Sequence, residues 1–184
     1  MDFDAIVIKS FAPLRKYDVV LGQKLRYSLA NGIILAKRAA PFLRIWLETY
    51  HTFQANEWAE HSCIIPMKLS KMFPHLLHIE ETSLIRPNWQ EADLLFNGHY
   101  PWRKNYAIHV WKRRGKVASN ETELVGLNST LGELMRHVLG QVLDTYHLMF
   151  HSVETERFHA IVDPIDHLLE EGLPRAIAVS SLVV

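Results

Sequence analysis

The chain has 184 residues, the length of one domain, and its 48% hydrophobic and 22% charged residues are values typical of a globular protein. Twenty Lys and Arg residues balance twenty Asp and Glu residues, so the formal net charge is zero. A nucleic-acid-binding protein needs a basic surplus to neutralise phosphates, so this balance argues against that class. The single cysteine, Cys63, excludes a disulfide within the chain.

The sequence shows no targeting or membrane-spanning segment. Met1-Asp2-Phe3-Asp4 lacks the basic stretch and apolar run that a signal peptide needs. The longest apolar candidate, residues 176–184, is too short for a transmembrane helix, which needs about 18 apolar residues. We therefore expect a soluble chain.

The first forty residues predict strands. Three apolar runs are rich in β-branched residues and too short for helices: residues 5–8, 17–21 and 32–36. Pro13, Gly22 and the pair Asn31-Gly32 are expected as turn residues between these strands. Buried strands of this kind usually belong to sheets covered on both faces, so the expected fold class is α/β.

Helical spacing begins at residues 41–53, with Pro41 well placed in the first turn. Further elements are expected in this order: a short helix at 66–73, strands at 77–79 and 108–111, a long helix at 131–150 and a short helix at 165–171. Residues 86–106 are expected as a loop rich in aromatic side chains, among them Trp89 and Trp102. Such side chains either pack on the domain or line a site, where they could stack on the apolar faces of sugars.

Asp2-Phe3-Asp4 is the first motif that points to chemistry. Two carboxylates at positions i and i+2 beside a strand point to the same side of the backbone. Mg²⁺ and Mn²⁺ favour such oxygen ligands, and the bound cation can neutralise a diphosphate. By itself, the motif also fits a solvated chain end without a function.

Four segments, taken in order, point to one family: D-F-D-A-I-V-I-K-S-F (2–11), L-A-N-G-I-I-L-A-K-R-A-A-P-F-L-R-I-W-L-E-T-Y (29–50), N-Y-A-I-H-V-W-K (105–112) and L-N-S-T-L-G-E-L-M-R (127–136). Together they resemble the glycosyltransferases whose sugar-binding region contains the Asp-x-Asp motif. The similarity is to the animal branch with α-1,4-galactosyltransferases and α-1,4-N-acetylglucosaminyltransferases.

This resemblance implies a GT-A-like fold, with a mixed sheet flanked by helices. It also implies transfer of a hexose or N-acetylhexosamine from a UDP-sugar to a glycan or glycolipid acceptor, with retention at the anomeric carbon and with Mn²⁺ or Mg²⁺. By position, Asp2 and Asp4 match the motif that binds the metal and the donor diphosphate. Asn31 matches a polar residue beside the donor sugar or the acceptor, and His109 matches a catalytic residue near the diphosphate or the metal. Trp111 is a looser match to the cofactor-binding set.

The family places nucleotide-binding βαβ units and a membrane anchor before the Asp-x-Asp strand. We therefore expect an N-terminally truncated form, in which residues 1–138 are the C-terminal part of the catalytic domain and residues 139–184 a helical extension. Full-length relatives would work in the Golgi, held in the membrane by the missing anchor. The sequons at Asn120 and Asn128 fit a lumenal protein.

Two alternatives remain at this point. One is a non-catalytic glycosyltransferase remnant that at most binds glycans through its aromatic loop. For His109 and for the tryptophans, a role only in packing the core also stays open. The other is an unrelated α/β metal-binding protein that uses two histidine pairs, His75 with His78 and His147 with His151. The residues between His147 and His151 lack the Glu of an H-E-x-x-H zinc motif, which argues against a zinc hydrolase.

Overall fold

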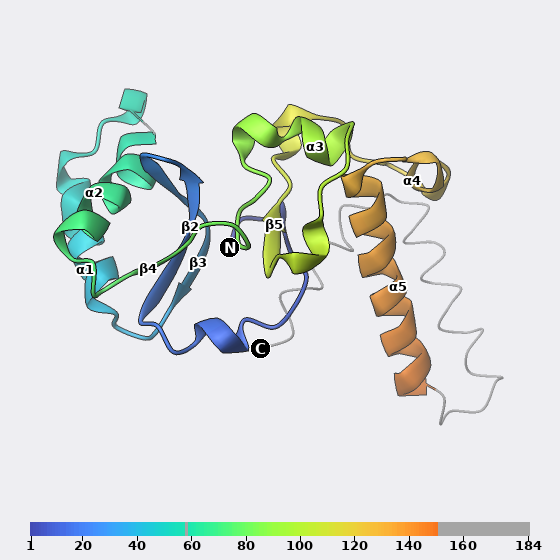
Figure 1. Ribbon diagram of the computed structural model, residues 1–184, viewed down its shortest axis with the longest axis horizontal. Helices are drawn as coiled ribbons and strands as arrows, with labels where there is room; N and C mark the ends of the chain where they lie inside the picture. Colours follow the sequence, from blue (N-terminus) through green and yellow to red (C-terminus); the bar gives the residue numbers. More distant parts are fainter. Residues whose placement is uncertain (58, 151–184) are drawn as a thin grey trace. The chain divides into compact units, whose positions relative to one another are not determined.

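The computed structural model describes residues 1–57 and 59–150 (Figure 1). Within them, the chain forms two compact units. The first unit consists of Met1–Ala92 and Pro101–Trp111, and the second of Asp93–Tyr100 with the described residues from Lys112 onward. The short helix expected at 165–171 and the residue His151 lie outside the described residues, as does most of the expected extension.

A three-stranded mixed sheet forms the main scaffold of the first unit. Its strands are β2 (Val19–Leu25), β3 (Ser28–Ala36) and β4 (His78–Glu80), in the order β3-β2-β4. β2 pairs with β3 antiparallel and with β4 parallel. This mixed sheet, flanked by helices, confirms the α/β class and the strands expected around residues 17–21, 32–36 and 77–79.

Two helices of the first unit pack against this sheet: α1 (Pro41–Glu48) and α2 (Ile65–Met72) (Figure 1). Pro41 starts α1, where its missing N–H costs nothing. Phe42 and Trp46 are four residues apart, so they share the buried face of the helix, and Trp46 Nε1 donates to the His61 carbonyl at 2.7 Å. The buried core contains these aliphatic and aromatic side chains: Val19, Leu21, Leu29, Phe42, Trp46, Met67, Leu69 and Leu77.

A second, smaller sheet of the first unit joins distant parts of the chain. It contains β1 (Ala5–Val7) and β5 (Ala107–His109), paired antiparallel with Ala5 opposite His109. The strands expected at 5–8 and 108–111 are thereby confirmed. Trp111 ends the extended run, because its backbone has a positive φ of 55°.

Gly22 and the pair Asn31-Gly32 were expected in turns, and that prediction is wrong. All three residues lie inside strands, and the β2–β3 turn falls between Leu25 and Ser28. A Cβ at Gly22 would lie 2.0 Å from Cγ1 of Ile85, so this glycine permits a close approach of another segment. The pairing shifts from Leu21 opposite Ile34 to Gly22 opposite Ala30, so residues 31–33 form a bulge in β3.

The aromatic stretch at residues 86–106 is more helical than expected. It contains 3₁₀ helices at Trp89–Glu91 and Trp102–Lys104, with α3 (Asp93–Phe96) between them. The Asn88 side chain caps the first of these helices, and all three are too short to show helical periodicity in the sequence. The remaining short helices are Ala12–Leu14, Thr49–Thr52, Ala55–Glu57, the π-helix Glu60–Ile64, and Lys112–Arg114.

Helices make up the second unit. α4 (Glu121–Gly126) is capped by the Asn120 side chain, and α5 (Thr130–Phe150) confirms the long helix expected at 131–150. Arg136 of α5 donates to the carbonyls of Leu124 and Leu127 at 2.7 and 3.0 Å, which satisfies acceptors at the end of α4.

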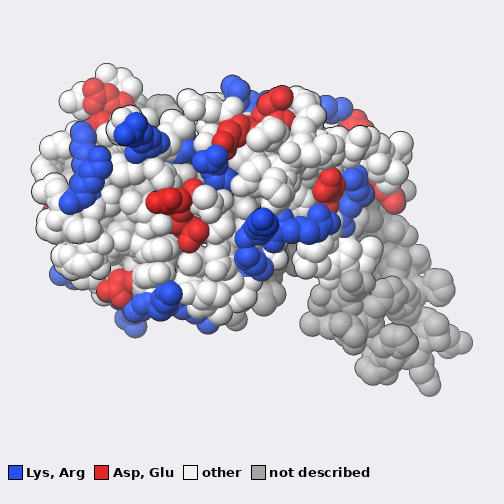
Figure 2. All heavy atoms as spheres, viewed as in Figure 1, with Lys and Arg blue, Asp and Glu red and all other residues white. Residues whose placement is uncertain are grey.

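α5 continues through residue 138, and the domain boundary placed there stays a prediction. None of the described helices is long and apolar enough to cross a membrane. On the face drawn in Figure 2, acidic and basic side chains are interspersed among uncharged ones.

Candidate functional site

Backbone hydrogen bonds hold the Asp2-Phe3-Asp4 segment in place just before β1. The Asp2 N–H donates to the Gly32 carbonyl at 2.7 Å, which ties the segment to the bulge in β3. The Asp4 carbonyl accepts from the Val110 N–H at 2.7 Å, which continues the β1–β5 pairing beyond β5. Three segments that are distant in sequence therefore meet here through main-chain contacts.

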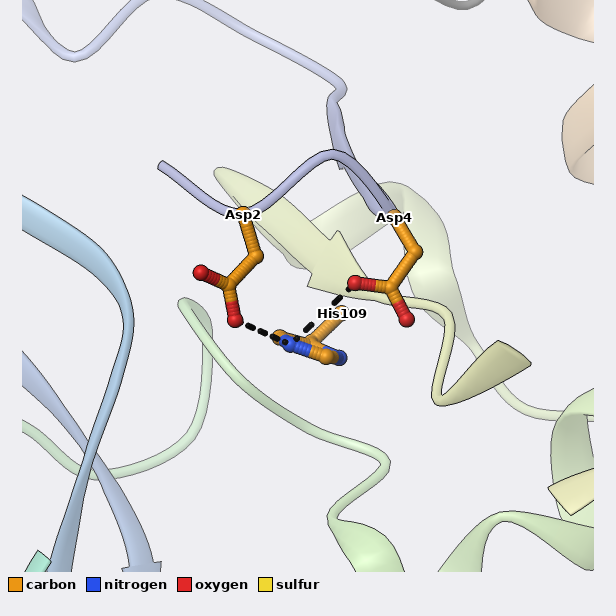
Figure 3. Close-up of side chains that lie close together, drawn as sticks. All are labelled: Asp2, Asp4 and His109. Carbon is orange, nitrogen blue, oxygen red and sulfur yellow. Dashed lines mark hydrogen bonds and ion pairs between the residues drawn. The ribbon is translucent and has the colours of Figure 1, made fainter. Parts of the chain in front are cut away.

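The imidazole of His109, the last residue of β5, faces both carboxylates (Figure 3). Its Nε2 lies 3.2 Å from Oδ2 of Asp2 and 3.5 Å from Oδ1 of Asp4. Each of the three residues offers one potential metal-ligand atom, a ring nitrogen or a carboxylate oxygen, and these atoms all lie within 4.8 Å of one another. Among the residues that the structure describes, this is the only group of three or more His, Cys, Asp or Glu side chains placed closely enough to share a metal ion. We call it the acidic cluster.

Burial differs sharply across the acidic cluster. The side chain of His109 is 8% exposed and that of Asp4 15%, whereas that of Asp2 is 53% exposed. A ligand would therefore reach the cluster from the side of Asp2.

Trp111 fixes the orientation of His109. Its backbone N–H donates to Nδ1 of His109 at 3.2 Å, and its indole stacks on the imidazole with ring centroids 3.9 Å apart. Because Nδ1 accepts this bond, the neutral imidazole carries its proton on Nε2 and presents it to the carboxylates. The Trp111 backbone has φ 55°, a rare conformation for a bulky residue that concentrates at functional sites.

Gly32 is a residue of the site that the sequence analysis missed. A Cβ at this position would lie 2.4 Å from Cδ2 and 2.7 Å from Nε2 of His109, distances that real Cβ atoms essentially never show. The position therefore needs glycine so that the imidazole can reach the carboxylates. The Asn-Gly pair was a visible signal, but its usual role in hairpin turns pointed elsewhere.

The structure brings together four of the five predicted site residues: Asp2, Asp4, His109 and Trp111. Trp111 is buried at 8% exposure, and its indole N–H is already donated to the Pro87 carbonyl at 2.8 Å. Trp111 therefore contacts the acidic cluster only at His109, through its backbone N–H and through ring stacking. Asn31 is exposed on the bulge in β3, next to Gly32, and is not part of the acidic cluster.

The donor set of the acidic cluster fits a hard divalent cation in part. The carboxylates of Asp2 and Asp4 are the oxygen ligands that Mg²⁺ and Mn²⁺ favour. His109 would join them as a third ligand only if its proton moved from Nε2 to Nδ1 and the hydrogen bond from Trp111 broke. In the arrangement seen here, the imidazole serves the carboxylates as a hydrogen-bond donor.

The pair His75 and His78 lies outside the acidic cluster. His78 stacks on Tyr17 at 3.8 Å, with its Nε2 3.3 Å from Glu80, and neither His78 nor His75 belongs to a metal-binding group among the described residues. Cys63 is buried and free.

Comparison with known proteins finds one fungal relative. The chain is 27% identical over 128 residues to a protein named glucan organizing enzyme 1 from Cryptococcus neoformans var. grubii. The match covers 61% of this chain and only 35% of that relative. No family model matches the chain. No solved structure matches it.

Proposed function

We propose that this chain carries the cation- and diphosphate-binding part of a glycosyltransferase, which transfers a hexose or N-acetylhexosamine from a UDP-sugar to a glycan acceptor. The observation that carries this proposal is the acidic cluster, in which residues 107 positions apart lie within hydrogen-bonding distance. The fungal relative's name, glucan organizing enzyme 1, supports an activity on carbohydrate. The four ordered segments that resemble glycosyltransferases support the finer assignment.

Each residue has a role in this proposal. Asp2 and Asp4 would hold Mn²⁺ or Mg²⁺, and the bound cation would supply neutralisation of the charge that develops on the departing diphosphate. The exposed side of Asp2 leaves room for the phosphate oxygens of the donor. His109 would donate its Nε2 proton in a hydrogen bond, either to a carboxylate of the cluster or to a phosphate oxygen. Asn31, on the neighbouring bulge, would contact a sugar hydroxyl.

Calorimetry of the full chain with UDP, in the presence and absence of Mn²⁺, tests this proposal. We expect Mn²⁺-dependent UDP binding that falls by about tenfold or more in Asp4→Asn, because the substitution removes a ligand charge while keeping the side-chain volume. The matched control is Asp18→Asn, whose carboxylate pairs with Lys37 at 2.7 Å outside the acidic cluster. This control should bind UDP as the unsubstituted chain does.

Turnover completes the test. Release of UDP from UDP-glucose, UDP-galactose and UDP-N-acetylglucosamine would be measured with and without saccharide acceptors. Absence of UDP binding in the unsubstituted chain contradicts the proposal. Saccharide binding without UDP binding would instead support the alternative of a non-catalytic glycan-binding module.

A further inference from the structure

Trp89 differs from the other tryptophans that the structure describes. Trp46, Trp102 and Trp111 are buried, with exposed fractions of 6%, 1% and 8%, whereas Trp89 is 36% exposed. Burial of Trp102 rules out contact between its ring and a sugar. Burying an indole removes more apolar surface from water than burying other side chains, and Trp89 forgoes part of that stabilisation. Tryptophan is enriched at binding interfaces, so an exposed tryptophan is a candidate for ligand contact.

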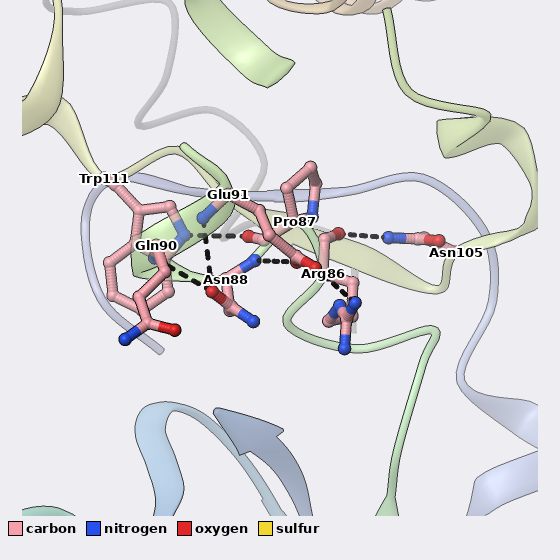
Figure 4. Close-up of polar contacts among 7 residues, drawn as sticks. All are labelled: Arg86, Pro87, Asn88, Gln90, Glu91, Asn105 and Trp111. Atoms are coloured by element: carbon pink, nitrogen blue, oxygen red, sulfur yellow. Dashed lines mark hydrogen bonds and ion pairs between the residues drawn. The ribbon is translucent and has the colours of Figure 1, made fainter. Parts of the chain in front are cut away.

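The turn that carries Trp89 is braced by a network of hydrogen bonds (Figure 4). Asn88 Oδ1 accepts from the N–H groups of Gln90 and Glu91 at 2.8 and 3.3 Å, and Glu91 Oε2 accepts from the Asn88 N–H at 3.0 Å. Asn88 is 6% exposed. The Glu91 carboxylate also pairs with Arg86. These hydrogen bonds, centred on the buried Asn88 side chain, restrain the backbone of the turn.

The braced turn is also joined to the residues around the acidic cluster. The Trp111 indole N–H donates to the Pro87 carbonyl at 2.8 Å, and the Asn105 side chain donates to the Arg86 carbonyl. The Trp89 and Trp111 rings meet edge to face, with centroids 5.8 Å apart and planes 89° apart. Trp111 stacks in turn on His109, so Trp89 is two ring contacts from the imidazole that faces the carboxylates.

We propose that Trp89 is a stacking platform for a pyranose ring that is bound beside the acidic cluster. This inference rests on the proposed function and names a subsite for it. The C–H groups on one face of a pyranose carry partial positive charge, because their carbons are bonded to oxygen. The face of an indole ring carries partial negative charge, so the two faces attract each other. A ring held rigid before binding loses little conformational entropy when the sugar arrives.

The pyranose could belong to the glycan or to the sugar nucleotide, and two titrations separate these sources. In the first, the full chain is titrated by calorimetry with maltohexaose and with laminarihexaose, without metal. In the second, it is titrated with UDP-glucose and with UDP, both in the presence of Mn²⁺. Trp89→Ala is expected to weaken saccharide binding by about tenfold, and Trp89→Phe by less than about threefold. If the donor sugar is the ligand, Trp89→Ala weakens binding of UDP-glucose and leaves UDP unchanged.

Three further variants test for indirect effects. Tyr27→Ala removes another exposed aromatic ring of the same unit, at 65% exposure, and should leave every titration unchanged. Asn88→Ala should weaken sugar binding although Trp89 is intact, and Asn88→Asp should restore it, because Asp also caps a helix. Thermal unfolding of each variant verifies that the chain still folds.

The outcomes separate the platform from the function on which it rests. The platform is overturned if the unsubstituted chain binds neither the saccharides nor UDP-glucose at millimolar concentration. It is also overturned if Trp89→Ala changes no titration, or if Tyr27→Ala weakens sugar binding equally. If UDP fails to bind with Mn²⁺ while saccharide binding depends on Trp89, the platform stands and the transferase proposal falls.

Discussion

The backbone N–H of Trp111 donates to Nδ1 of His109 at 3.2 Å, from a main-chain conformation with φ 55° that few tryptophans adopt. A residue in this region costs roughly 1–3 kcal/mol and persists only where its surroundings hold it. Here the surroundings are the stacked imidazole and the Pro87 carbonyl, which accepts the indole N–H. The strained residue therefore determines which nitrogen of His109 faces the carboxylates.

The first prediction concerns this tautomer. In the neutral ring of the metal-free chain, Nε2 of His109 should carry the proton and Nδ1 should be unprotonated, because Nδ1 accepts a hydrogen bond from the Trp111 N–H. Long-range ¹⁵N correlation spectra at pH 8 distinguish the two nitrogens by their chemical shifts, and His109→Asn identifies the signals. A proton found on Nδ1 would show that the Trp111 bond does not form in solution.

Gly32→Ala should damage both the fold and the acidic cluster, because the added Cβ would lie 2.4 Å from Cδ2 of His109. Overpacking of this kind costs about 1–3 kcal/mol. Urea unfolding measures the loss, and Mn²⁺-dependent UDP binding should weaken in parallel. Gly140→Ala is the control: a Cβ there meets nothing within 4 Å, and the change should stabilise α5 by about 0.5–1 kcal/mol. Equal stability of Gly32→Ala and the unsubstituted chain would mean that the close approach is absent.

Thr130 should be important for the stability of the second unit. Its hydroxyl accepts from the Tyr100 N–H at 2.7 Å and lies 3.2 Å from the Gly98 carbonyl, to which it donates, and the residue is fully buried. Thr130→Val keeps the shape but removes the hydroxyl that accepts from the Tyr100 N–H, at a cost of about 1–3 kcal/mol. The Gly98 carbonyl still accepts from the backbone N–H of residue 130, at 2.9 Å. Chemical unfolding followed by far-ultraviolet circular dichroism measures this cost. The exposed Thr122 provides the control, and Thr122→Val should change stability little.

Glu123 should titrate at unusually low pH. The Lys116 ammonium first, and then the Ser119 backbone N–H and hydroxyl, lower the pKa of this carboxyl from 4.5 to about 2. Since the folded-state pKa is depressed, the stabilising contribution is complete above pH 4.5 and is lost as pH falls through about 2. Carboxyl ¹³C titration checks the pKa directly. Lys116→Met should raise it, and 1 M salt should also raise it because the Lys116–Glu123 pair is accessible to solvent. An unchanged value in Lys116→Met would exclude the lysine as the main cause.

Local patterns in the sequence predicted most of the elements. The long helix at 131–150 was recognisable from the helical spacing of its apolar residues, and the strand at 5–8 from a short apolar run rich in β-branched residues. Gly22 and Gly32 were misplaced because the side chains that crowd them, Ile85 and His109, are far away in the sequence. A glycine gives no local sign of whether it makes a turn or permits a close approach.

The candidate site was predicted in part for the same reason. Asp2 and Asp4 were selected by the spacing of their carboxylates and by resemblance, and His109 by resemblance alone. Their contact depends on the pairing of β1 with β5, which a linear pattern does not show. The orientation of His109 depends on one backbone angle of Trp111, which no residue preference predicts. Trp89 and Trp102 occur in the same aromatic stretch, and only their burial distinguishes them.

The unequal exposure of the acidic cluster has a consequence for rates. An incoming ion or phosphate meets Asp2 first, and the charge of Asp2 is screened by salt because its side chain is half in solvent. Asp4 and His109 are largely buried, so less water surrounds them, and electrostatic attraction between these residues and a bound ligand is stronger there. Asp2 should therefore govern how fast a ligand arrives, with a strong dependence on ionic strength, while Asp4 governs how long the ligand stays.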